Sequence, residues 1–91
     1  MQESVILLHR QNEIRGIRNN HRLIETRLAH GDLIYSVFLT TQDSTDVTEE
    51  FAFDVAPSLQ EAFRFFDLIE TGNVTACTLN DVSQDYRLSL A

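Results

Sequence analysis

Four arginines lie between residues 10 and 22 of a chain that is otherwise acidic, and their side chains suggest the first chemistry to consider. The four are Arg10, Arg15, Arg18 and Arg22. A guanidinium group presents a planar fork of N–H donors that matches the paired oxygens of a phosphate or a carboxylate. The stretch could therefore bind a phosphate backbone, or it could pair with carboxylates of the protein itself.

The distribution of charge favours pairing with carboxylates. The chain has 91 residues and a net charge of −7, and all seven of its formal cations are arginines. Residues 1–30 hold five arginines and three acids, whereas residues 31–91 hold two arginines and eleven acids. Most of this surface would repel a polyanion. In addition, no Phe, Tyr or Trp lies between Gln11 and Leu33 to stack on nucleic-acid bases.

Carboxylates that these arginines could meet lie around a predicted strand at residues 46–55. We expect the arginine-rich segment to lie beside that strand, either within the chain or across a subunit interface. Exposed ion pairs contribute only ~0 to 1 kcal/mol each, so they would set register and partner choice more than stability. The predicted interaction surface comprises Arg10, Arg15, Arg18, Arg22, Asp46, Glu49 and Glu50.

Patterns for catalysis or metal binding are weak. His30 and Asp32 flank a predicted turn, but His21 lies at the far end of a strand roughly 27 Å long or more and cannot share an ion with His30. Cys77 is the only cysteine and falls in an apolar run, where burial would make its thiol inert. No serine has the glycine-flanked turn of a nucleophile, and the three glycines are too dispersed for a phosphate loop. The sequence predicts no enzyme activity, no metal and no cofactor.

Length and composition bound the architecture. We expect residues 1–91 to form a single domain, and 43% hydrophobic with 23% charged residues is typical of a globular protein. Because a domain of this size buries only about 60–65% of its extended-chain surface, association of two copies would add stability. One cysteine and the absence of a long apolar run favour a cytoplasmic protein without a membrane span.

Alternation of apolar and polar residues predicts a sheet in the first part of the chain. Residues 5–8 form a short apolar strand, and the sequence leaves open how much of residues 1–20 is ordered. Residues 21–29 and 33–41 flank a His-Gly pair and predict a hairpin. A further strand lies at residues 47–55.

The strand at 47–55 shows the clearest alternation. Phe51, Phe53 and Val55 alternate with Ala52 and with acidic residues. Successive side chains of a strand point to opposite faces. We therefore expect both phenyl rings on the core side of the sheet.

A helix is predicted after Pro57. Ser58 and Glu61 have the spacing of a capping box, and Gly72 predicts a left-handed C-terminal cap. The predicted apolar stripe of this helix comprises Leu59, Ala62, Phe63, Phe66 and Ile69. Residues 74–79 are expected to return to the sheet as a strand, and a short helix follows from residue 80.

The element order is thus β-β-β-β-α-β-α. The predicted fold class is α+β: a small, twisted, mostly antiparallel sheet with one amphipathic helix packed on one face. The stretch from about residue 33 to residue 86 resembles a family of short bacterial proteins of unknown function. The resemblance is carried by a Y-x-V strand and an L-N-D-V-x-x-D motif, at Tyr35, Val37, Leu79, Asn80, Asp81, Val82 and Asp85. It implies no activity, cofactor or catalytic residue, and it leaves out the arginine-rich segment.

Together these features predict a small cytoplasmic interaction domain with an accessory or regulatory role. Its predicted partner is a protein, either a second copy in a homodimer or another chain, bound through the N-terminal segment and an exposed sheet edge. The first alternative is a nucleic-acid-associated factor that uses the four N-terminal arginines. The second is a small-ligand module with a pocket between the strand and helix phenylalanines Phe51, Phe53, Phe63 and Phe66.

Overall fold

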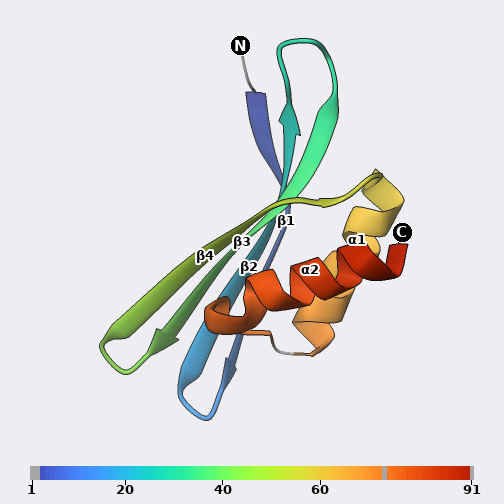
Figure 1. Cartoon of the computed structure of the whole chain (residues 1–91). Coiled ribbons are helices and arrows are strands. Elements are labelled where there is room, and N and C mark those ends of the chain that lie inside the picture. Colours follow the sequence, from blue (N-terminus) through green and yellow to red (C-terminus); the bar gives the residue numbers. More distant parts are fainter. Residues whose placement is uncertain (1–2, 73, 91) are drawn as a thin grey trace.

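The structure is a computed structural model that describes residues 3–72 and 74–90 (Figure 1). Four antiparallel strands form one sheet in the order β1-β2-β3-β4, with bounds Glu3–Ile14, Ile17–Arg27, Leu33–Asp43 and Asp46–Ala56. Two helices follow, α1 (Leu59–Thr71) and α2 (Leu79–Leu90), joined through the 3₁₀ turn η1 (Ala76–Thr78). The predicted α+β class with an antiparallel sheet is confirmed. No helix among these residues is long and apolar enough to cross a membrane.

The first hairpin is longer than its sequence suggests. β1 and β2 pair from Glu3 to Arg27, and the chain turns at Arg15 and Gly16, whose φ angles are 54° and 81°. Asn19 lies inside β2, where its side chain accepts a hydrogen bond from the Thr41 hydroxyl (2.7 Å). The apolar run at residues 5–8 is therefore only part of a strand that also contains the polar residues up to position 14.

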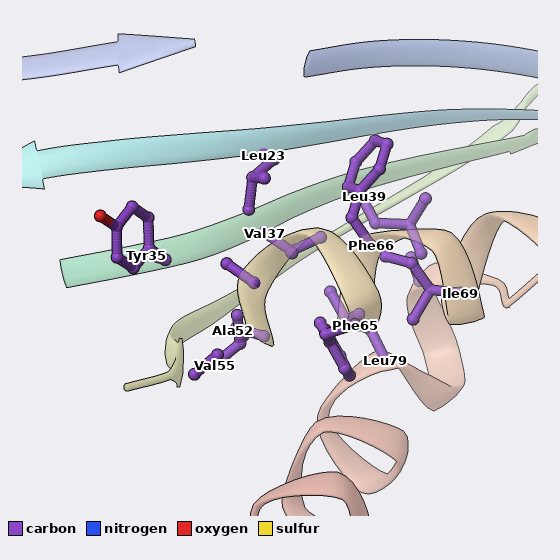
Figure 2. Packing of buried hydrophobic residues seen from close by; sticks show 13 residues of the cluster. Leu23, Tyr35, Val37, Leu39, Ala52, Val55, Phe65, Phe66, Ile69 and Leu79 are labelled. Atoms are coloured by element: carbon purple, nitrogen blue, oxygen red, sulfur yellow. The ribbon is translucent and has the colours of Figure 1, made fainter. Parts of the chain in front are cut away.

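Both helices pack on the same face of the sheet (Figure 1). The core lies between them and strands β2 to β4. Its buried apolar side chains are Leu23, Tyr35, Val37, Leu39, Ala52, Val55, Ala56, Ala62, Phe65, Phe66, Ile69, Ala76 and Leu79. Figure 2 shows Val37 and Leu39 of β3 beside α1, with Leu79 of α2 next to Phe65.

The buried stripe of α1 differs from the predicted one. Phe65 is fully buried, whereas Phe63 is 41% exposed and Leu59 is 39% exposed. The cause is α2, which was predicted only as a short helix. The ring of Tyr86 on α2 lies 5.1 Å from the ring of Phe65, centroid to centroid, so the buried side of α1 extends toward α2. A helix with two neighbours buries a wider stripe than a helix that covers a sheet alone.

The start of α1 is set by Ser58, as predicted. Its hydroxyl accepts a hydrogen bond from the backbone N–H of Glu61 (3.2 Å). We expect Ser58→Ala to lower the free energy of unfolding by about 1 kcal/mol, because an N–H of the first turn loses its acceptor. Chemical denaturation measures the change, and Ser58→Asp is the control that keeps an acceptor. Equal losses in both variants would contradict a capping role.

The end of α1 corrects two predictions. Gly72 has φ −82° rather than a left-handed conformation. A glycine is favoured at position 72 for another reason: a Cβ there would lie 3.1 Å from the Leu68 carbonyl oxygen, which is a close contact. Residues 74–79 do not form a strand. Ala76 and Leu79 are buried at helical spacing, and the N–H of Ala76 bonds the Thr41 hydroxyl (2.9 Å) instead of a strand backbone.

An irregularity near the end of β4 corrects the predicted direction of its phenylalanines. Pairing of Val37 with Ala52 is followed by pairing of Tyr35 with Ala56, so β4 carries two extra residues. Within this bulge Asp54 has φ 55°, and its N–H donates to the buried Ser36 hydroxyl (3.3 Å). Small Ala52 faces the core before the bulge and Val55 and Ala56 are buried after it. The ring of Phe51, which pairs with Phe38, is left on the other side of the strand, and Phe53 lies in the bulge and is 59% exposed.

Candidate functional site: the open face of the sheet

One face of the sheet carries both helices, and no described element covers the other. We call this uncovered side the open face. Its residues follow from the strand register, because directly opposite residues point to the same side. Leu23 and Val37 are paired and lie in the core, so their neighbours Arg22 and Phe38, also paired, point to the open face. Phe38 pairs in turn with Phe51 of β4.

Apolar side chains from all four strands meet on the open face. They are Ile6, Ile24, Ile34, Phe38, Val47 and Phe51. Phe51 is 45% exposed and Phe53 is 59% exposed, and their ring centroids lie 6.2 Å apart. Single exposed apolar side chains are ordinary, but a group of this kind on one face is typical of an interaction surface. We call these six residues, Ile6, Ile24, Ile34, Phe38, Val47 and Phe51, the apolar band.

Charged side chains lie beside the apolar band on β1, β2 and β4. On β2, a guanidinium nitrogen of Arg18 lies 3.5 Å from a carboxylate oxygen of Glu13 on β1. The guanidinium carbon of Arg22 lies 5.7 Å from the ring centroid of Phe38, a cation–π contact. On the other side of the face, β4 presents Glu49, which is exposed. The open face is thus basic along β2 and acidic along β4.

The four arginines of the predicted interaction surface do not lie together in the structure. Arg18 and Arg22 point to the open face, while Arg15 lies at the turn between β1 and β2. Arg10 points to the helix side, where its Nε lies 3.9 Å from a carboxylate oxygen of Glu70 on α1. Alternation along the strands puts them on different sides, so they do not form one continuous basic patch.

The three predicted acids are also divided. Glu49 lies on the open face, Asp46 lies at the turn that begins β4, and Glu50 accepts a hydrogen bond from the Asn80 side chain on the helix side. β3 lies between β2 and β4, so pairing of the arginines with strand β4 inside one chain is wrong. Pairing across a subunit interface stays a prediction.

A second unusual group, which sequence reasoning missed, lies beneath the connection between the two helices. His21 is fully buried, and its Nε2–H donates to the carbonyl oxygen of Val74 (3.1 Å). Its Nδ1 is buried and has no hydrogen-bond partner among the described residues. Burial lowers the pKa of His21 below its ordinary 6.5, although the bond to Val74 and the charge of Glu70 act in the opposite direction.

The remaining candidates for chemistry lie at the surface. His30 and Asp32 form an exposed pair at the tip of the β2–β3 hairpin, with 2.8 Å between Nε2 and Oδ2. Cys77 lies exposed in η1, which corrects its predicted burial in a strand. Across residues 3–72 and 74–90, no three His, Cys, Asp or Glu side chains come together in a way that could hold a metal ion.

The predicted pocket between the strand and helix phenylalanines does not form. Phe66 is in the core, Phe63 is exposed on α1, and Phe51 points to the open face. A different groove of about 450 Å³ lies between β4 and α2. It is lined by Phe53, Asn80, Ser83, Gln84, Arg87 and Leu88.

The sequence does not predict the apolar band, because either of the two alternating sets of side chains in β4 could be the buried one. Phe51, Phe53 and Val55 suggest one buried side, whereas Ala52 and Ala56 suggest the opposite side. Larger side chains normally decide such a choice, since they gain more free energy on burial. Here the small residues face α1 and α2, because helices packed closely against a strand leave little room for phenyl rings. No local sequence pattern predicts that two helices pack on the side of β4 that carries Ala52 and Ala56.

Comparison with protein-family models, with curated proteins and with solved structures finds no match to this chain. The resemblance over residues 33–86 to short bacterial proteins therefore stays a prediction. What the chain does must be argued from its own surface, and the open face is the part of that surface with the most distinctive composition.

Proposed function

We propose that this chain is a small interaction domain that self-associates through its open face and has an accessory or regulatory role in the cytoplasm. The observation that carries this proposal is the apolar band, in which Ile6, Val47 and Phe51 are about half exposed on a face without a covering layer among the described residues. A sheet with one bare apolar face is normally completed by another layer, either a helix or a second sheet. A second copy supplies such a layer without any further protein.

The charges on the open face favour a second copy of this chain as the occupant. A twofold axis parallel to the strands exchanges the β1–β2 side of one copy with the β3–β4 side of the other. β4 then lies over β1, and Glu49 of one copy approaches the part of the other copy that carries Arg18 and Arg22. The phenyl-bearing half of each copy then lies over the β1–β2 half of the other, which carries Ile6 and Ile24. The same pair of contacts is made twice with opposite charges facing each other, as an isologous interface requires.

Sedimentation analysis over a range of concentrations tests this proposal with a matched pair of variants. Phe51 and Phe63 are both phenylalanines with similar exposure, 45% and 41%. Phe51 lies on the open face, whereas Phe63 lies on α1. We expect wild type to form dimers in the micromolar range, and Phe51→Glu to weaken dimerisation about 100-fold or more, because a carboxylate would be desolvated among apolar side chains. Phe63→Glu should dimerise like wild type.

The charge arrangement provides a second arm of the same experiment. Arg22→Glu should weaken dimerisation about tenfold or less, and the added change Glu49→Arg should restore part of the loss. High salt should reduce the effect of each change. A wild-type chain that stays monomeric at millimolar concentration would overturn the proposal. Equal loss in Phe51→Glu and Phe63→Glu would assign the interface to another surface.

The nucleic-acid alternative has weaker support. Two arginines share the open face, but Arg18 is paired with Glu13 and Arg22 lies over a ring. Acidic side chains on the same face would oppose a phosphate backbone. Salt-sensitive retention on a polyphosphate resin, abolished by Arg18→Glu but not by Phe51→Glu, would favour this alternative over self-association.

A further inference from the structure

The connection between α1 and α2 is held on the sheet by two polar side chains, in addition to the apolar packing of Ala76 in the core. Val74 and Ala76 of this connection bond to the side chains of His21 (3.1 Å) and Thr41 (2.9 Å), from adjacent strands β2 and β3. Thr41 is itself oriented by its bond to Asn19 (2.7 Å). Because both bonds go to backbone groups, they position the chain between the helices whatever its side chains are. The connection leads directly into α2.

His21 makes this attachment sensitive to protonation. Its Nε2–H already bonds to Val74, so an added proton must sit on Nδ1, which is buried without a partner among the described residues. The ring of Phe66 meets the imidazole edge-on, with 6.4 Å between centroids, and offers no acceptor in the ring plane. A buried N–H without an acceptor costs on the order of its desolvation penalty, and a buried charge costs more.

The charged groups around His21 come from two neighbouring elements. Arg10 of β1 is its cross-strand partner, and Glu70 of α1 lies in contact with Arg10 (3.9 Å). From β3 the partner is Leu39, which carries no charge, and residues 74 and 75 of the connection are Val and Thr. Glu70 would favour a protonated imidazole and Arg10 would oppose it. The effects of Glu70 and Arg10 oppose each other, so burial is the dominant influence on the pKa of His21.

We propose that His21 and Thr41 form an acid-sensitive latch, in which neutral His21 holds the connection on the sheet and protonation of His21 releases it. Release frees residues 74–78 first and exposes the buried surface beneath α1 and α2. The latch is independent of self-association through the open face, because its residues point to the opposite side of the sheet.

The direction of the pH effect follows from burial. The pKa of His21 is lower in the folded chain than in the unfolded chain, so the unfolded chain binds more protons between the two values. The contribution of His21 to stability is complete above the unfolded pKa of about 6.5 and is lost as the pH falls below it. At pH 5.0 the wild-type folding equilibrium constant should have dropped relative to a variant without this imidazole, by at most about thirtyfold, the limit that the unfolded pKa sets.

Two measurements test the latch. First, NMR titration of the imidazole resonances in wild type should show His21 gaining its proton at lower pH than a histidine in a disordered peptide. Second, chemical denaturation from pH 7.5 to 5.0 should show a steeper loss of stability for wild type than for His21→Gln, which keeps an N–H donor but cannot be protonated. His9→Gln on the open face and His30→Gln at the hairpin tip should keep the wild-type dependence on pH.

Hydrogen exchange separates a latch from a general loss of stability. At pH 5.5, after correction for intrinsic exchange rates, amides at 76–79 should lose protection in wild type before those of β2 and β3. Thr41→Val should expose the Ala76 amide at both pH 5.5 and pH 7.5, since it removes the uncharged half of the latch. The proposal is overturned if His21 in the folded chain titrates like a free histidine. It is also overturned if wild type and His21→Gln lose stability in parallel.

Discussion

Phe65→Ala should lower the free energy of unfolding by about 3–5 kcal/mol, the largest loss we expect from a single truncation in this protein. Phe65 is fully buried between the sheet and the second helix, and its ring contacts the ring of Tyr86 (5.1 Å between centroids). Truncation removes the transfer free energy of the ring and leaves a cavity that two packed helices and a sheet cannot fill. A domain of this size has only about 5–14 kcal/mol of stability in total.

The matched control is Phe63→Ala, two residues earlier in the same helix. Its ring is 41% exposed, so we expect a loss of no more than about 1 kcal/mol. Both variants remove the same atoms at helical positions with the same propensity, and only burial differs. Urea denaturation at constant pH measures both. If Phe63→Ala cost as much as Phe65→Ala, the stripe predicted from the sequence would be right and the packing of α2 against α1 would be wrong.

Leu79→Ala should cost about 2–5 kcal/mol. Leu79 is the first residue of α2, is fully buried and belongs to the core cluster, so it anchors the start of the helix on the sheet. Its loss should also loosen the rest of α2. Further along that helix, the hydroxyl of Tyr86 donates to a carboxylate oxygen of Glu61 on α1 (2.8 Å). We expect amides of α2 to exchange faster in this variant, in addition to the lower midpoint of denaturation.

Leu88→Ala is the control for Leu79→Ala. Leu88 lies in the same helix and is 69% exposed, so its truncation removes the same methyl groups without opening a cavity. We expect a change below about 0.5 kcal/mol. A large effect of Leu88→Ala at concentrations where the chain is monomeric would indicate that α2 packs through a different side than the one described here.

Local residue chemistry accounts for the elements that were predicted correctly. The His-Gly turn and the Ser58 cap depend on neighbours within a few residues, so each can be recognised without the rest of the chain. In β3 both sides carry large apolar residues, so only the structure shows that Tyr35, Val37 and Leu39 face the core.

The errors share a different origin, which is competition between elements distant in sequence. The apolar pattern of α1 predicts burial of Phe63 and not Phe65 if the helix packs on a sheet alone. The second helix beside α1 changes which side is buried. Residues 74–79 have strand-forming residue types. They form a turn and the beginning of a helix instead, because the Ala76 N–H bonds to Thr41 and the apolar side chains pack in the core. In both places the tertiary packing contributes several kcal/mol, whereas intrinsic preferences differ by about 1 kcal/mol or less per residue.

The candidate sites divide in the same way. From the sequence alone follow the α+β class, the excess of arginine at the start of the chain, the acidic remainder, and the interest of the arginine-rich stretch as an interaction surface. Tertiary structure decided which side of the sheet each arginine occupies, that Phe51 and Phe53 lie outside the core, and that His21 is buried under a chain connection. Composition and turn chemistry depend on single residues and their neighbours. The side that a strand turns to the core depends on what packs against it, and here that is supplied by two helices that follow all four strands in the chain.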